Sequence, residues 1–485
     1  MTENPHHARR WAILAILGIA QLMVVLDATI VNIALPSAQK ALHFSNDNRQ
    51  WIVTAYSLAF GSLLLLGGKL SDVFGRKWTF IAGLAGFAIA SGIGGASQSF
   101  AMLTAARAAQ GAFGALLAPA ALSLLTTTFT ETSERNRAFG VYGAIAGSGA
   151  SVGLLIGGIL TQYLSWRFCM YVNLVFAVVA ISGALALLHN QAPAVKPKID
   201  IPGALTVFGG LFALVYGFNH AQTTSWGDPV TVAVLATGVV LLVVFVAIER
   251  RVRSPLLPLR VVLDRNRGAS YLSVGLAFAA MFGVFLFLTY YLQQTRGYSP
   301  VKTGLAFLPL TAVVMVTAVT ATTRLRGRFG PRTLVVVGLL CGAGAMLILT
   351  GLGVSSSYLT AILPALVLTG VGLGLVFATS INSATLGVEP RDAGVASATV
   401  NASQQIGGSL GTALLSTIAA SAATSFLTGG ARPTPALVAQ AAVHGYTTAF
   451  AVSAAIFAIA AVIAGLLYEG KAKQPAPVAE PVLAA

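Results

Sequence analysis

One acidic residue, Asp27, lies inside the apolar run from Trp11 to Leu35. The chain has 14 Asp and Glu residues, and Asp27 is the only one that the pattern of apolar runs places deep inside a run. A carboxylate in membrane hydrocarbon is costly, and it is usually retained because protons, ions or substrates pass it. Asp27 therefore predicts a carrier in which this carboxyl group binds and releases a proton.

A second charge, Arg107, is expected at a similar depth in another apolar run. Counted from the expected outer surface, Asp27 is about nine residues deep and Arg107 about seven, or roughly 13 Å and 10 Å at about 1.5 Å per residue. An ion pair would lower the cost of burying both charges, and a nearby arginine would tune the proton affinity of Asp27. Two interpretations stay open. The pair opens when Asp27 takes a proton or meets a cationic substrate, or it is a permanent structural pair.

The composition is that of an integral membrane protein. Of 485 residues, 56% are hydrophobic and 9% are charged, whereas about 25% are charged in soluble domains. The net charge of +15 does not indicate nucleic-acid binding, because the basic residues lie in short loops between apolar segments. Cys169 and Cys341 fall in different segments without CxxC spacing, so neither a disulfide framework nor a metal site is expected.

The predicted fold is an all-α integral membrane protein with 14 transmembrane helices. A helix needs about 20 apolar residues to cross the bilayer. The stretches that meet this length have expected limits of 12–35, 50–69, 78–98, 100–128, 138–162, 169–188, 200–220, 229–249, 269–292, 304–324, 333–352, 358–386, 393–423 and 443–468.

The distribution of Lys and Arg predicts the orientation in the membrane. With both termini in the cytoplasm, the cytoplasmic segments hold 22 of the 29 basic residues and the outer loops hold six. Basic residues gather in cytoplasmic loops, so both termini are expected there. The abundance of Ala, Gly, Val and Arg suggests a GC-rich bacterium, and the expected location is its plasma membrane.

Two short basic loops, Gly67–Lys77 and Arg324–Arg332, indicate an internal repeat because they align on their Phe-Gly pairs. The simplest interpretation is two six-span halves, with the substrate site near the midplane between them. The expected organisation is a cytoplasmic N-terminus (1–11), an N-terminal six-helix bundle (12–188), two inserted transmembrane helices (200–249), a basic cytoplasmic loop (250–268), a C-terminal six-helix bundle (269–468) and a disordered cytoplasmic tail (469–485).

Several motifs occur in the order found in one transporter family. They are Leu26–Pro36 in the first span, Gly67–Lys77 after the second, Arg107–Gly111 in the fourth, Gly149–Gly158 in the fifth and Trp166–Asn173 after it. With these motifs the chain resembles the major facilitator superfamily, and within it the fourteen-span drug:proton antiporters. It departs from the family at Leu154, where proline is frequent, and at Leu174-Val175, where Val-Pro is usual, so the kink geometry expected there is in question.

The resemblance implies roles for three groups of residues. Asp27 and Arg107 are expected to couple proton movement to transport. The loop after the second span is expected to hold an inner gate shut, although its charges also suit simple anchoring; its residues are Gly68, Asp72, Gly75, Arg76 and Lys77. A stripe of small residues lets helices pack closely, and in the family it is tied to sealing the path of exporters; its residues are Gly149, Gly153, Gly157 and Gly158.

Candidate substrate contacts lie near the middle of the predicted spans. A mostly apolar cavity with a few polar groups suits amphipathic organic molecules. Buried amides also hold helices together, and phenylalanines also contact lipid or neighbouring helices, so the same residues have a structural interpretation. The candidates are Gln21, Asn32, Gln110, Phe282, Tyr290, Asn401 and Gln405.

The expected function is a proton-coupled antiporter that exports amphipathic drugs, dyes or antibiotics by alternating access. The sequence has no GxxxxGK[ST] loop for ATP and no loop long enough for an enzyme, so neither catalysis nor a cofactor is expected. The expected partners are a small amphipathic substrate, protons and the lipid bilayer, but no nucleic acid, and the chain is expected to be a monomer. A proton-coupled uptake symporter and a non-transporting membrane sensor on the same fold are the alternatives.

Overall fold

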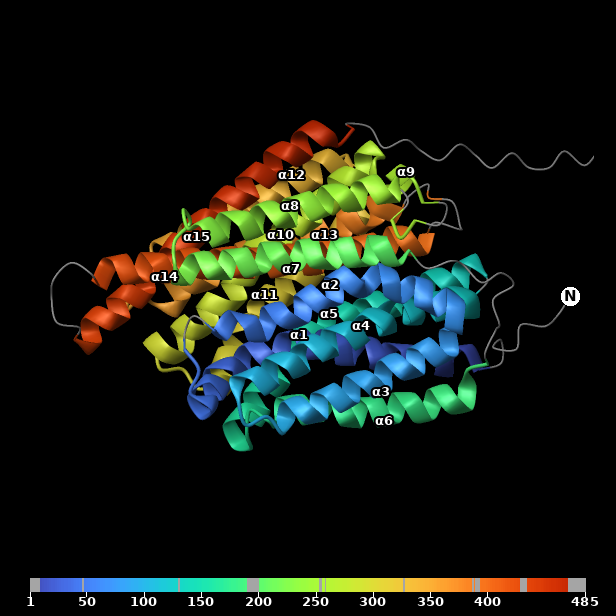
Figure 1. Cartoon of the computed structure of the whole chain (residues 1–485), viewed down its shortest axis with the longest axis horizontal. Helices are drawn as coiled ribbons and strands as arrows, with labels where there is room; N and C mark the ends of the chain where they lie inside the picture. The colour runs from blue at the N-terminus through green and yellow to red at the C-terminus, as the bar shows by residue number, and fades with distance from the viewer. Residues whose placement is uncertain are drawn as a thin grey trace, which may run out of the picture.

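The computed structural model describes residues 9–45, 48–129, 131–189, 200–252, 255–257, 259–325, 328–385, 388, 393–427 and 434–469. Long helices run side by side through this part of the chain (Figure 1). Residues 1–8 of the predicted N-terminal segment lie outside the described residues. The predicted tail does as well, apart from Glu469.

The first six helices form one group, which we call the N-terminal half. Apolar runs in a membrane form helices because each backbone N–H and C=O must find its partner within its own segment. The helices are α1 (Arg10–Leu42), α2 (Arg49–Phe74), α3 (Arg76–Gly95), α4 (Phe100–Thr128), α5 (Thr132–Tyr163) and α6 (Phe168–Leu187).

The last six long helices form the C-terminal half. They follow a short helix, α9 (Leu259–Val262), and three of them continue into or start from a π-helical turn: η2 (Tyr291–Thr295), η3 (Ala321–Leu325) and η4 (Tyr358–Ile362). The long helices are α10 (Arg265–Tyr290), α11 (Pro300–Thr320), α12 (Pro331–Thr350), α13 (Leu363–Thr385), α14 (Ala393–Leu427) and α15 (Pro435–Leu467).

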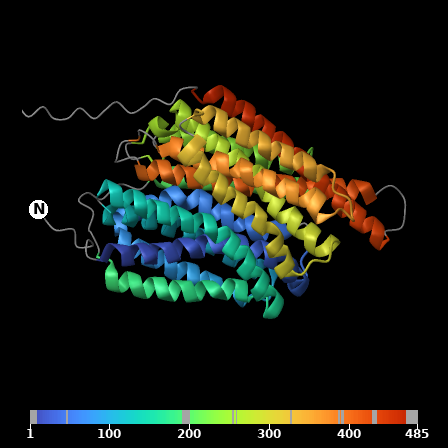
Figure 2. The same ribbon diagram turned by 180° about the vertical axis from the view of Figure 1, so that it is seen from behind.

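The same pairs of helices pack in both halves. In the N-terminal half, α1 packs on α4, α5 and α6, whereas α4 also packs on α2 and α3, and α3 on α6. In the C-terminal half, α10 packs on α13, α14 and α15, whereas α13 also packs on α11 and α12, and α12 on α15. Each of these six contacts in the first half thus has its counterpart in the second, as a duplicated six-helix unit would give. Between the halves, α5 packs on α11 and α2 on α14 (Figure 2).

The helices α7 (Ile201–Thr223) and α8 (Pro229–Glu249) form a hairpin between the two halves in the sequence. The hairpin crosses the front of the molecule in Figure 1, and α7 packs on α2 and α14. The Oγ1 of Thr417 in α14 donates a hydrogen bond to the carbonyl oxygen of Phe218 at 2.9 Å. The hairpin therefore covers one seam between the halves, while α8 itself faces outward.

A helix lies at each of the fourteen predicted positions. Within the described residues, 12 helices are long and apolar enough to cross a membrane. The other two positions belong to α2 and α5, and the first turns of α5 hold Glu134, Arg135 and Arg137. The twelve spans establish a multi-span membrane protein, and the fourteen-span count stays a prediction.

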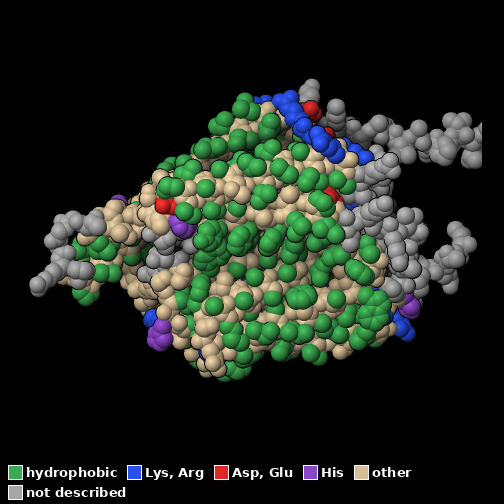
Figure 3. All heavy atoms as spheres, in the orientation of Figure 1, with side chains coloured by type: hydrophobic (Ala, Val, Ile, Leu, Met, Phe, Trp, Pro, Cys, Tyr) green, Lys and Arg blue, Asp and Glu red, His purple; other side chains and the backbone are tan. Residues whose placement is uncertain are grey.

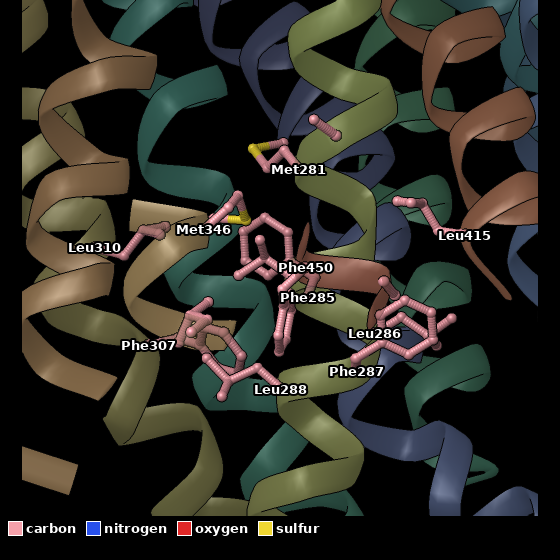
Figure 4. Packing of buried hydrophobic residues seen from close by; sticks show 14 of the residues in the cluster. Met281, Phe285, Leu286, Phe287, Leu288, Phe307, Leu310, Met346, Leu415 and Phe450 are labelled. Atoms are coloured by element: carbon pink, nitrogen blue, oxygen red, sulfur yellow. The ribbon is translucent and has the colours of Figure 1, made fainter. Parts of the chain in front are cut away.

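The C-terminal half is held together by a cluster of apolar side chains on α10. Phe285, Phe287 and Leu288 are at most 9% exposed. Figure 4 shows Phe285 and Phe307 close together, with their ring centres 5.5 Å apart. In a membrane, side chains of this size stabilise the bundle through van der Waals packing between helices. Part of the aromatic series on this helix is therefore structural core.

Candidate functional site

The carboxylate of Asp27 is fully buried in the N-terminal half and forms an ion pair with Arg107. Its Oδ2 lies 2.6 Å from Nη1 of Arg107, and the two side chains are 0% and 1% exposed. Removing one partner of such a pair leaves an uncompensated buried charge, which typically costs about 3–5 kcal/mol. The sequence placed these residues on different helices at one depth, and the structure brings them together.

The other carboxylate oxygen accepts two amide hydrogen bonds. The Nε2 of Gln110 donates to Oδ1 of Asp27 at 3.0 Å, and Nδ2 of Asn173 donates at 2.7 Å. The hydroxyl of Ser91 lies behind both amides, 2.7 Å from Gln110 and 3.4 Å from Asn173. Three donors from α4 and α6 therefore converge on the carboxylate of α1, and Ser91 joins α3 to the same network.

Arg107 links this network to α2. Its Nε donates to the carbonyl oxygen of Ile52 at 3.1 Å, and its guanidinium lies 4.3 Å from the centre of the Tyr56 ring. Its Nη1 also donates to Oε1 of Gln110 at 2.9 Å. A planar guanidinium combines directed hydrogen bonds with ring stacking, whereas an ammonium group cannot provide both in this arrangement.

Two polar atoms beside the ion pair have no hydrogen-bond partner among the described residues. They are the hydroxyl of Tyr56 and Oδ1 of Asn173. Rotating the Asn173 side-chain amide would present Oδ1 to Asp27 in place of Nδ2, and this oxygen could then accept a hydrogen bond from a protonated carboxyl group. The Asn173 amide can thus donate a hydrogen bond to the ionised carboxylate of Asp27 or accept one from its protonated form.

The backbone holds Arg107 in place through close packing of α4 on α2. A side-chain carbon at Gly111 would overlap the carbonyl oxygen of Tyr56, and one at Gly114 would lie 2.7 Å from the Phe60 ring. The small residues one and two turns after Arg107 therefore set how closely the two helices approach. Along the same helix, Pro119 lies inside α4.

The predicted glycine stripe of α5 packs against the turns of α1 that carry Asp27. A side-chain carbon at Gly149 would lie 2.9 Å from Val25, one at Gly153 would overlap Thr29, and one at Gly157 would lie 2.8 Å from Ile30. Gly158 instead faces the carbonyl oxygen of Pro300 in α11. The four glycines therefore serve two interfaces, one that positions α1 and one between the halves.

The predicted gating loop forms a tight turn between α2 and α3. Gly75 has a φ of 87°, a left-handed conformation that favours glycine. The Nζ of Lys77 donates to the carbonyl oxygen of Leu188 at 2.6 Å, which ties the turn to the end of α6. Gly68 lies near Pro119 of α4, and Arg76 is half-buried at the start of α3. The side chain of Asp72 lies outside the described part of the structure.

The predicted substrate-contact residues do not form one cluster. Gln110 belongs to the Asp27 network, and Gln21 accepts a hydrogen bond from Tyr142 of α5 at 2.7 Å. Asn32 is 3% exposed and donates to the carbonyl oxygen of Ala28 in its own helix at 3.4 Å. The Phe282 ring would lie 2.7 Å from a side-chain carbon at Gly408. These positions are helix contacts in this structure.

Asn401 and Gln405 lie half-buried in α14. Gln405 lies at the seam between the halves, where a side-chain carbon at Gly61 of α2 would approach Cβ of Gln405 to 2.8 Å. Asn401 lies one turn earlier on the same helix. Gln405 is therefore one of the predicted residues that lie where the two halves meet.

Tyr290 forms part of a contact between the halves. Its hydroxyl donates to Oε1 of Gln39 at 2.8 Å, and the Arg49 guanidinium lies 4.1 Å from its ring centre. The side-chain amide of Gln293 donates to the carbonyl oxygen of Ile33 at 3.2 Å. These contacts join α10 and η2 to the C-terminal part of α1 and the start of α2. This side of the molecule is the one predicted to face outward.

Three residues of the Asp27 network were not predicted as site residues. Asn173 belongs to the motif Trp166–Asn173, whereas Ser91 and Tyr56 belong to none of the predicted motifs. The available signal was their polarity within apolar helices, but serine and tyrosine are common in membrane helices. Only their convergence on Asp27 distinguishes them.

Comparison with known proteins supports one family. The family model of the Major Facilitator Superfamily matches residues 17–412. The chain is 48% identical over 471 residues to the puromycin resistance protein pur8 of Streptomyces alboniger, covering 97% of this chain and 93% of the relative. It is 38% identical over 405 residues to the cephamycin export protein CmcT of Amycolatopsis lactamdurans, covering 83% of each.

The fold has solved counterparts. A bacterial homolog of the human lysosomal transporter Spinster, in an inward-facing and unoccupied conformation, superposes with a TM-score of 0.65 at 17% identity, covering 94% of this chain and 96% of that one. The likeness at this identity concerns the fold alone. Taken with the sequence relatives and with the 12 helices of the described residues that are long and apolar enough to cross a membrane, it leads to one conclusion: the chain belongs to the major facilitator superfamily, as a membrane transporter of the branch that contains antibiotic resistance and export proteins, and is not an enzyme.

Proposed function

We propose that this protein is a proton-coupled antiporter that exports amphipathic antibiotics or related compounds across the bacterial plasma membrane. The observation that carries the proposal is the buried Asp27 carboxylate with its three donors. Intramembrane ionisable groups of this kind are typical of proton relays. The names of relatives, which include puromycin resistance and cephamycin export, support an amphipathic organic substrate.

Proton binding at Asp27 would weaken its attraction to Arg107. The neutral carboxyl group no longer compensates the guanidinium charge. Its O–H can donate a hydrogen bond to Oδ1 of Asn173 once the Asn173 amide has rotated. Arg107 then keeps its bonds to α2 at Ile52 and Tyr56. A change of charge at Asp27 in α1 would therefore alter the position of Arg107 and, through its contacts, of α2.

Helix α2 connects this change to the other half of the molecule. It packs on α14, where Gly61 brings the two backbones close beside Gln405 and Ile406. A shift of α2 at its Arg107 contact therefore acts on the seam between the halves. Rocking of the halves around a central site is the general mechanism of such transporters.

The proposal includes fourteen membrane spans and cytoplasmic termini. Two contacts support helix ends that share one side of the membrane. Arg10 at the start of α1 pairs with Glu134 at the start of α5 at 2.7 Å. Arg265 at the start of α10 donates to the carbonyl oxygens at the end of α15. The charge distribution of the loops supports the cytoplasm as this side.

Proteoliposomes with an imposed pH gradient test the proposal. Ethidium or puromycin flux would be measured together with proton flux reported by a trapped pH dye, for the wild type and Asp27→Asn. The expected result is drug movement opposite to proton movement, abolished in the variant. Co-directional flux would indicate a symporter, and no flux with any compound would indicate a sensor. Proton-coupled flux in Asp27→Asn equal to wild type would show that Asp27 is not the proton site.

A further inference from the structure

A groove of about 570 Å³ lies on the outward face of α8, over its second half. Its wall is apolar along Val239, Val243, Val246 and Ala247, and it ends at Arg250 and Arg251 where the helix stops. Val239 and Val243 are 54% and 64% exposed, so this face is not covered by other parts of the described structure.

The two arginines carry charge that the described protein does not neutralise. Both side chains are exposed, and neither forms an ion pair within the described residues. The adjacent Glu249 is 4% exposed and accepts a hydrogen bond from the Leu257 backbone N–H at 2.9 Å, so its carboxylate is directed inward. Figure 3 shows basic side chains gathered at the end of the molecule where α8 ends and α9 lies.

The length of the groove matches one leaflet of a bilayer. From Val239 to Arg250 the helix rises by roughly 16 Å at about 1.5 Å per residue. This is about half of the roughly 30 Å hydrocarbon thickness. An acyl chain along the valines would therefore place its phosphate group at the arginines.

A second groove on the same hairpin provides an internal comparison. It has about 530 Å³ and lies near the other end, lined by residues that include Phe212, Tyr216, Val230 and Thr237, with no charged side chain. The two grooves are similar in volume and in apolar character. Charge, rather than shape, distinguishes the one that ends at Arg250.

We propose that the groove along α8 is a binding site for an anionic phospholipid of the cytoplasmic leaflet, with the acyl chain on Val239, Val243 and Val246 and the phosphate on Arg250 and Arg251. The leaflet assignment rests on the orientation given under the proposed function. Basic pockets at the cytoplasmic ends of membrane helices select anionic head groups. Because α7 of this hairpin packs on both α2 and α14, the bound lipid would brace the seam between the halves.

The test is native mass spectrometry of the purified full-length protein in detergent with added phosphatidylglycerol or phosphatidylcholine. At about 1 kcal/mol per basic residue near the surface, the wild type is expected to prefer phosphatidylglycerol by about 30-fold, the equivalent of about 2 kcal/mol. Arg250→Ala with Arg251→Ala is expected to lose this preference. Ala247→Trp, which fills the groove and keeps both charges, is expected to weaken retention of the lipid.

Two controls separate the site from general charge effects. Arg324→Ala with Arg328→Ala removes two exposed basic residues from the loop Arg324–Arg332, away from α8, and is expected to leave the preference unchanged. Arg250→Lys with Arg251→Lys is expected to retain most of it. Equal retention of both lipids by the wild type, an unchanged preference in both the Arg250/Arg251 and Ala247 variants, or displacement by glycerol phosphate alone would overturn the proposal. The measurement needs no transport, so its failure is distinct from failure of the antiport mechanism.

Discussion

The Nη1 of Arg107 lies 2.6 Å from Oδ2 of Asp27, and the same guanidinium bonds the backbone of Ile52 and stacks on Tyr56. One side chain therefore joins the only acid of α1 to α2, which packs on α14 of the opposite half. Arg107 thus connects the ion pair to a second helix as well as balancing its charge.

Arg107→Lys is expected to lower transport at least tenfold although the charge is retained. A lysine ammonium can meet Asp27 but cannot also bond Ile52 and stack on Tyr56 with fixed geometry. Initial rates of drug flux in proteoliposomes measure the effect. The matched control is Tyr56→Phe, which keeps the ring and removes a hydroxyl that has no partner among the described residues. That variant is expected to transport normally and to gain up to about 1 kcal/mol of stability.

Asn173→Leu is expected to lower the rate of proton-coupled transport. Loss of the Asn173 amide removes one of the two amide donors to Oδ1 of Asp27, and with it the group that can also accept a hydrogen bond from the protonated carboxyl group. The measurement is the initial rate of drug-driven proton flux. Ser91→Ala removes a group that contacts the amides but not Asp27, and it is expected to lower the rate less. A normal rate in Asn173→Leu would exclude Asn173 from proton handling.

Gly153→Ala is expected to reduce both transport and thermal stability. The added carbon would overlap Thr29 and lie 3.1 Å from the Leu26 carbonyl oxygen, so α5 must move away from the turn of α1 that holds Asp27. Overpacking of this kind costs about 1–3 kcal/mol. Gly92→Ala in α3 is the control, because its added carbon would meet Leu174 at an ordinary 3.9 Å. Melting curves in detergent and flux assays should separate the two variants, and equal behaviour would contradict a role for the stripe in positioning α1.

A reducible bifunctional thiol cross-link between Gln162→Cys and Val301→Cys is expected to stop transport reversibly. The Val301 backbone N–H donates to Oε1 of Gln162 at 3.3 Å, which places the end of α5 beside the start of α11 in the opposite half. Both native cysteines would first be replaced by serine. If the halves must part here during the cycle, the cross-link will block flux and reduction will restore it.

The control applies the same reagent to Thr224→Cys with Thr231→Cys within the α7–α8 hairpin, whose hydroxyls are 3.5 Å apart. Full transport by the cross-linked Gln162/Val301 variant would show that this contact stays closed.

The class of the protein and much of its organisation can be predicted from its residues alone. Apolar runs of the right length locate the helices, because the bilayer requires each segment to satisfy its own backbone hydrogen bonds. The buried charges Asp27 and Arg107 were recognisable for a similar reason, since the surrounding residues are almost all apolar. The Gly67–Lys77 turn could be predicted from its glycines and charged residues, and Gly75 does adopt a left-handed conformation.

Which of these residues come into contact depends on how the helices pack. The amides of Gln110 and Asn173 are far apart in the sequence, and they converge on one carboxylate only because α4 and α6 both pack on α1. Gln110 was predicted to contact substrate, but here its donors are used by Asp27 and Ser91. The glycines of α5 likewise divide between α1 and α11, a difference set by helix rotation. Periodicity places residues on one face of a helix, but the packing of several helices determines what that face touches.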